Sequence, residues 1–181
     1  MSLRDEFYDN KEEGRGPRLG SRGPCWNGKA PADFIRGAVE SVAVKVGTKL
    51  NSSEPSRKMV IVLTDAVGHI TTDDDDGNRS ARKFATHDES PFVSVVMDGP
   101  RGAALAQAFD DAPEDCPLWL QVRYAGQGPK KDRNKSRPTY LEIKIWDRIP
   151  APGVHPVVTL DMSAERSERA PLAVPDEAVA L

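Results

Sequence analysis

The sequence predicts a mainly β domain with one short helix, flanked by disordered arms. Three observations lead to this prediction. Valine-rich stretches recur in the first half of the chain, a single segment has good helix-forming composition, and Leu118–Ile149 alternates apolar and polar residues. Such alternation is typical of half-buried strands. A chain of 181 residues has room for one domain of about 100–150 residues plus tails.

The two ends of the chain differ in composition from its middle. Residues 1–31 are rich in Gly, Pro, Arg and Glu and have no apolar periodicity, which predicts a disordered N-terminal arm with Trp26 as a local anchor. Residues 151–181 form a Pro/Ala-rich acidic tail that we expect to be mostly disordered, with one short apolar run at 157–160. The folded domain is therefore predicted over residues 32–150.

The first half of this domain reads as three strands. Residues 33–46 are rich in Val and contain Gly37, which predicts a long strand bent or bulged at that glycine. Residues 58–65 form a second strand with a nearly continuous apolar core. An acidic turn at 72–78 precedes a third strand at 79–86.

The next segments predict a short strand and the helix. Residues 92–97 read as another short strand or an inserted edge. Residues 102–111 contain strong helix formers, and Ala104, Leu105, Ala108 and Phe109 recur at helical spacing.

The hairpin at Leu118–Ile149 supplies the last two strands. Its inner face is apolar, and its outer face carries Trp119, Gln121, Arg123, Tyr140, Glu142, Lys144, Trp146 and Arg148. Large aromatic side chains are costly to leave in solvent unless something covers them. The connecting loop, 127–138, has five cations against a single aspartate, a net of +4.

The order of elements is three strands, one helix and two strands, which is the arrangement of the OB-fold. That fold is a five-stranded, partly open Greek-key barrel, and its loops between strands 1–2 and strands 4–5 contact nucleic acid. In this chain those loops are residues 47–57 and 127–138. The most basic segment of the chain thus falls on one of the two expected binding loops.

With these elements, the chain resembles single-stranded DNA-binding proteins of the OB-fold type, especially those of bacteriophages of actinobacteria. The matching pieces are the G-x-V opening at residues 37–39, the MVIVLTD strand followed by the Asp76–Gly77 turn, and the LQVRYAGQG and TYLEIKIW strands around the basic loop. The resemblance covers roughly residues 32–150 with diffuse motifs. It implies sequence-tolerant binding and protection of single strands during DNA replication or recombination.

Candidate nucleic-acid-binding residues come from the loop and the outer face of the hairpin. Aromatic rings stack on bases, and cations contact phosphates. The candidates are Lys130, Lys131, Arg133, Lys135, Arg137, Trp119, Arg123, Tyr140, Lys144, Trp146 and Phe84. For Trp119, Tyr140 and Trp146 the sequence leaves a second interpretation open, burial under a tail or in a subunit interface. Phe84 fits a core position equally well.

The sequence does not favour an enzyme. The three histidines share no ligand spacing, and no H-E-x-x-H, G-x-S-x-G or Walker loop is present. Aligning Gly77 with the glycine of an EF-hand loop places Thr72 and Lys83 at two ligand positions, so Asp73–Asp76 reads as a solvated turn. We therefore expect no catalytic residue, no metal site and no cofactor.

The expected partners are single-stranded DNA, with RNA as an alternative ligand, and further copies of the chain. Many bacterial proteins of the family that the chain resembles end in an acidic, apolar-tipped tail that recruits partners, so the resemblance implies contacts with replication or recombination proteins through the acidic tail. This chain ends in VPDEAVAL, which lacks the aromatic terminus typical of those tails. Two distant cysteines fit a reducing cytoplasm, the host's if the protein is phage-encoded, and no apolar run suggests a membrane span. The alternative function is a structural β-barrel, such as a virion component, whose aromatic face mediates assembly.

Overall fold

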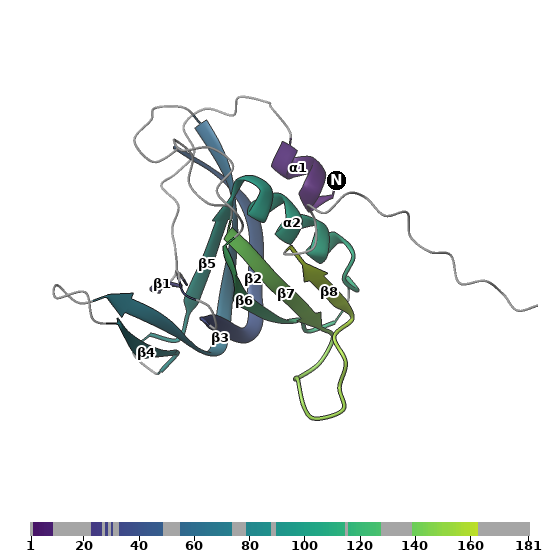
Figure 1. Ribbon diagram of the computed structural model, residues 1–181. Coiled ribbons are helices and arrows are strands. Elements are labelled where there is room, and N and C mark those ends of the chain that lie inside the picture. Colours follow the sequence, from purple (N-terminus) through teal and green to yellow (C-terminus); the bar gives the residue numbers. More distant parts are fainter. Residues whose placement is uncertain are drawn as a thin grey trace, which may run out of the picture.

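The fold was analysed in a computed structural model that describes residues 2–8, 23–26, 28, 30, 33–48, 55–73, 79–87, 90–114, 116–127 and 139–162. Strands dominate these residues, and Figure 1 shows their arrangement. The elements are α1 (Leu3–Tyr8), β1 (Cys25–Trp26), β2 (Phe34–Thr48), β3 (Pro55–Asp73), β4 (Arg79–Ala85), β5 (Val93–Asp98), α2 (Gly99–Asp110), β6 (Trp119–Gln127), β7 (Thr139–Trp146) and β8 (Val158–Asp161).

All eight strands belong to one mixed sheet. Its order is β1-β5-β3-β2-β6-β7-β8, with β4 paired to β3 beside this path, and β1 is parallel to β5 while the other pairs are antiparallel. The long strand β3 changes partners along its length. Residues 58–63 pair with β5 and residues 67–73 pair with β4, and Asp65 between them has a positive φ of 47°.

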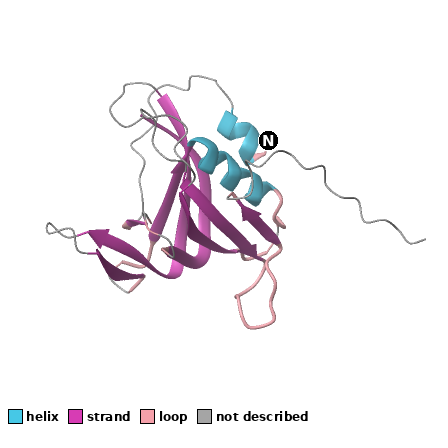
Figure 2. Cartoon of the chain, in the orientation of Figure 1, coloured by secondary structure: helices cyan, strands magenta, loops and turns pink. Residues whose placement is uncertain are grey.

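The sheet curls around helix α2. This helix contacts β3 and β5 toward one end of the strand order and β7 and β8 toward the other end. Both helices lie together against the sheet, while β4 and the end of β3 extend away from them (Figure 2). Buried side chains from the helices and from alternate positions of the strands form one core, which includes Ile35, Ile61, Val95, Leu105, Val122 and Ile143.

The mainly β class predicted from the sequence is confirmed, but a closed barrel is not present in the described residues. The two sides of the curled sheet contact α2 instead of pairing with each other. The predicted strands and the helix are found close to their predicted positions, except that β3 runs from Pro55 to Asp73 and so extends well beyond the strand predicted over 58–65 and into the predicted acidic turn. The bulge expected at Gly37 is also present, since the β2–β3 register shifts between Arg36 and Ala38. A Cβ atom at Gly37 would lie 2.8 Å from the carbonyl oxygen of Thr64, so the close approach of β3 requires glycine there.

The prediction of a disordered N-terminal arm is wrong for the residues that form α1 and β1. The Asp110 carboxylate accepts hydrogen bonds from the backbone N–H groups of Leu3 and Arg4, at 2.8 and 2.9 Å, which caps the first turn of α1. Phe7 is buried against Gly102 of α2, where a Cβ atom would lie 2.7 Å from the phenyl ring. Trp26 is buried as expected of a local anchor, and its indole N–H donates to the carbonyl of His69.

The prediction of a mostly disordered tail is wrong for residues 151–162. The chain turns after β7 and returns as β8, which extends the sheet by pairing with residues 142–145. Val158 and Leu160 pack against the core, so the apolar run noted in the sequence is a strand. Residues 163–181 lie outside the described part of the chain. Among the described helices, none is long and apolar enough to cross a membrane.

Tyr124 of β6 is expected to make the fold less stable at alkaline pH. Its side chain is buried, and this burial raises the pKa of its hydroxyl above the usual value of 10.0. At pH values between the unfolded and folded pKa, the unfolded chain binds fewer protons than the native one, so stability falls as pH rises. We expect the urea midpoint to decline from about pH 10 upward, and to decline less in the Tyr124→Phe variant. Equal declines in both proteins would contradict this assignment.

Candidate nucleic-acid interface

The face of the sheet opposite the core, here called the outer face, brings residues of β4, β3, β2, β6 and β7 into register. Strand pairing places the same-face residues of neighbouring strands directly opposite one another. The first row consists of Lys83, His69, Phe34, Arg123 and Glu142. The second row consists of Ala85, Val67, Arg36, Gln121 and Lys144. A third row contains Ala38, Trp119 and Trp146.

Phe34 lies at the centre of the first row in a fixed environment. Its ring meets the His69 imidazole edge-on, with ring centroids 5.1 Å apart and an interplanar angle of 81°. The neighbouring Asp33 is fully buried, and its carboxylate accepts hydrogen bonds from the Thr71 N–H at 3.0 Å and the Thr71 hydroxyl at 2.8 Å. These bonds tie the start of β2 to the end of β3 and hold Phe34 against His69.

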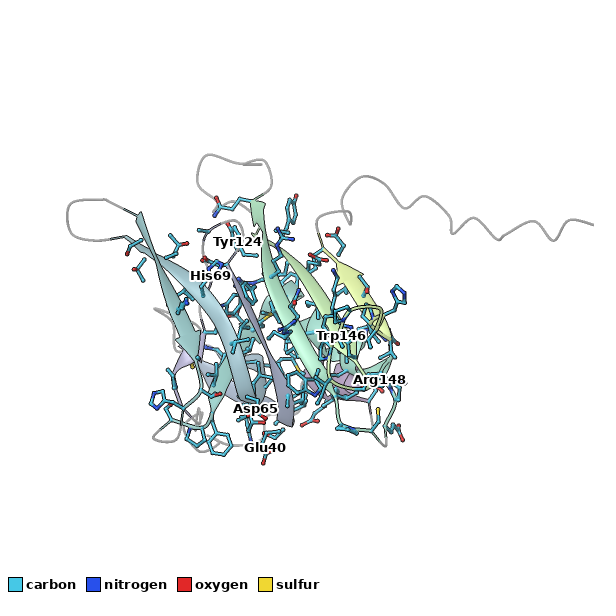
Figure 3. All side chains as sticks on the ribbon, turned by 90° about the horizontal axis from the view of Figure 1, so that it is seen from below. Glu40, Asp65, His69, Tyr124, Trp146 and Arg148 are labelled. Atoms are coloured by element: carbon cyan, nitrogen blue, oxygen red, sulfur yellow. The ribbon has the colours of Figure 1, made fainter. Side chains whose placement is uncertain are left out.

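The His69 imidazole also approaches the Asp33 carboxylate. His69 Nδ1 lies 3.3 Å from Asp33 Oδ1, although the two atoms do not have hydrogen-bond geometry. The contact is therefore an ion pair only when the imidazole is protonated. Figure 3 shows His69 and Tyr124 near one end of the sheet, with Glu40 and Asp65 at the opposite end.

The charge on the outer face is unevenly distributed. In the three rows, β4, β3, β2 and β6 contribute Lys83, Arg36 and Arg123 and no carboxylate. Within the described part of the chain, Arg36 and Lys83 form no ion pair. The first carboxylate of these rows is Glu142 on β7, which lies between Arg123 and Lys144. In these three rows the charged residues from β4 to β6 are therefore cations, and the first carboxylate appears at β7.

The aromatic candidates of the hairpin have different surroundings. Trp119 and Tyr140 are half-buried on the outer face, opposite Trp146 and Gly126 respectively. Trp146 is only 7% exposed, and its indole N–H donates to the carbonyl oxygen of Val154 at 3.3 Å. The prediction that Trp146 is open to stack on a base is therefore wrong, because the segment returning to β8 covers it. The alternative interpretation, burial under a tail, is confirmed for this residue.

The other candidates fall partly outside the described residues. The side chain of Phe84 is not described, although its backbone pairs with Gly68 on β3. The loop cations Lys130, Lys131, Arg133, Lys135 and Arg137 all lie outside the described residues. The chain leaves the sheet at Gln127 and rejoins it at the paired Thr139, which is the end where Arg123 and Tyr140 lie.

Sequence reasoning missed Phe34, Arg36 and His69. A signal for the first two was present, because Phe34 and Arg36 alternate with the apolar Ile35 and Gly37 at the start of the valine-rich strand. His69 was considered only as a catalytic or metal-binding residue. Among the described residues, no group of three or more His, Cys, Asp or Glu side chains could hold a metal ion.

The chain was also compared with known proteins. No protein-family model, no curated protein and no solved structure matches it.

Proposed function

We propose that the outer face binds single-stranded DNA without strong sequence preference, and that the protein protects single strands during replication or recombination. The observation that carries this proposal is the first row. It places the Phe34 ring between His69 and Arg123, and the charged residues of the three rows from β4 to β6, Lys83, Arg36 and Arg123, are cations; the Asp33 carboxylate beside His69 is buried. Aromatic rings stack on any base, and cations follow the phosphates, so this combination suits a ligand of arbitrary sequence.

The path that we propose for the DNA runs across the strands. Neighbouring strands are about 4.8 Å apart, so the first row from β4 to β7 spans roughly 19 Å. Single-stranded DNA on this path meets Lys83 first, then the Phe34–His69 pair, and then Arg123. Arg36, Trp119 and Tyr140 flank it, and we propose that the five cations of residues 130–137 add phosphate contacts at the β6–β7 end.

We interpret the curled sheet as an open variant of the OB-fold. Three features support this interpretation. Strand β2 pairs with both β3 and β6, the β3–β4 pair follows it in the sequence, and α2 precedes β6. In that assignment β3 and β4 are the second and third strands, whose face binds nucleic acid in this fold. His69 and Lys83 belong to these two strands.

The second candidate function is assembly of subunits through the outer face. Val67 favours it, because this apolar side chain is 44% exposed in the second row, next to Arg36. The burial of Trp146 weakens it, because one of the three aromatic residues of the proposed contact is already covered within the chain.

A fluorescence titration separates the two functions. Trp26 and Trp146 are buried, so the half-buried Trp119 is the tryptophan that reports on the outer face. We expect poly-deoxythymidine to quench this emission, with affinity that falls as salt is added by roughly 0.7 log unit per phosphate contact for each log unit of salt. The Trp119→Phe variant should lose most of the quenching.

The two functions predict different results in this titration and in sedimentation. A stable oligomer by sedimentation, together with no quenching and no mobility shift at low salt, would reject DNA binding in favour of assembly. Binding of oligouridylate as tight as that of oligothymidylate would extend the ligand to RNA.

A further inference from the structure

We infer that the Glu142 carboxylate competes with DNA phosphates for Arg123 and Lys144 on the outer face. This inference rests on the proposed function and concerns how tightly the same site binds. Glu142 Oε1 lies 2.5 Å from Lys144 Nζ, and Glu142 Oε2 lies 3.8 Å from Arg123 Nη1. One carboxylate thus engages Arg123, which lies on the proposed DNA path, and Lys144, which lies beside that path in the second row.

The position of Glu142 suits this role. It is the next residue after Arg123 in the first row, so a DNA single strand that passes from Phe34 over Arg123 arrives at the Glu142 carboxylate. The Glu142 side chain is 22% exposed, against 53% for Arg123 and 31% for Lys144. The cations therefore reach farther into solvent than the anion that holds them.

Carboxylate and phosphate oxygens compete for the same donors. Arginine forms paired hydrogen bonds with either anion, and lysine binds either as a point charge. When a phosphate takes Arg123 or Lys144, Glu142 loses a partner and is left as an anion beside the DNA. That carboxylate then recruits a cation from solution, so fewer counterions are released in total. Glu142 should therefore weaken DNA binding and flatten its salt dependence.

The test compares two variants that remove the same charge. Glu142→Gln keeps the side-chain shape, and Glu40→Gln makes the same change at an exposed position of β2, at the end of the sheet away from His69 (Figure 3). For oligothymidylate at low salt, we expect Glu142→Gln to bind about three- to tenfold more tightly than wild type. Its salt slope should be steeper by roughly 0.7, the value of one phosphate contact. Glu40→Gln should differ from wild type by less than about twofold.

A double variant tests whether the effect is local. With Lys144→Met in the background, Glu142 has lost its closer partner, and we expect the gain from Glu142→Gln to shrink. If wild type binds DNA but Glu142→Gln binds no more tightly than Glu40→Gln, the inference is wrong while the proposed function stands. If neither wild type nor Glu142→Gln binds, the proposed function itself fails. Circular dichroism of each variant verifies that its fold is intact.

Discussion

Replacing Phe34 with alanine is expected to weaken the binding of oligothymidylate by about five- to 150-fold, the range of one lost base-stacking contact. Phe34 lies between His69 and Arg123 at the centre of the cationic rows, and its ring is held edge-on to the imidazole. Without the phenyl ring, a base loses its stacking partner at position 34. The measurement is the dissociation constant at fixed salt, obtained by anisotropy of a labelled oligonucleotide.

Three further substitutions isolate the role of the ring. Phe34→Leu keeps apolar bulk without a ring and should bind as weakly as the alanine variant, whereas Phe34→Trp should retain most of the affinity. Val67→Ala removes an exposed apolar side chain from the second row of the same face and should change affinity little. Equal affinities for wild type and Phe34→Leu would show that Phe34 does not stack on a base.

Replacing Ile143 with alanine is expected to lower the free energy of unfolding by about 2–5 kcal/mol. Ile143 is fully buried at the middle of β7, opposite Val122 on β6 and Leu160 on β8. Truncation loses apolar contacts and leaves a cavity where three strands and α2 enclose the core. Urea unfolding monitored by circular dichroism measures the loss.

A surface substitution on the neighbouring strand provides the control. Thr159→Ala changes an exposed residue of β8 opposite Lys144 and should alter the free energy of unfolding by no more than about 0.5 kcal/mol. A loss below about 1 kcal/mol for Ile143→Ala, with an unchanged urea dependence, would contradict the placement of β7 in the core.

The strands were predictable because their patterns are local. Alternation in β6 and β7, the apolar core of β3 and the helix-forming composition of α2 each identify an element without knowledge of its neighbours. Three elements were missed, each because it depends on distant partners. Strand β1 has two residues and depends on its pairing with β5. Helix α1 has six residues, too few to be stable alone, and it depends on the Asp110 carboxylate and on burial of Phe7 against α2. Strand β8 has four residues in a Pro-rich context and depends on pairing with β7.

The candidate site was less predictable than the fold, because it depends on register between distant segments. The chemistry of Arg123 and Lys144 was evident in the sequence, but their shared partner Glu142 has a meaning only once β6 and β7 are paired. Phe34 and His69 are 35 positions apart and meet through the β2–β3 register. No local pattern could show that the segment around Val154 covers Trp146, since that contact arises from the turn between β7 and β8.

The central claim is that single-stranded DNA lies on the outer face, and photocrosslinking tests it most directly. Oligothymidylate substituted with 5-bromodeoxyuridine is bound to the full chain at low salt and irradiated, and the modified residues are identified by mass spectrometry. The predicted result is attachment at Phe34, His69, Trp119 or Tyr140, lost when salt is raised. Attachment confined to α1, α2 or other residues away from the outer face would contradict the account.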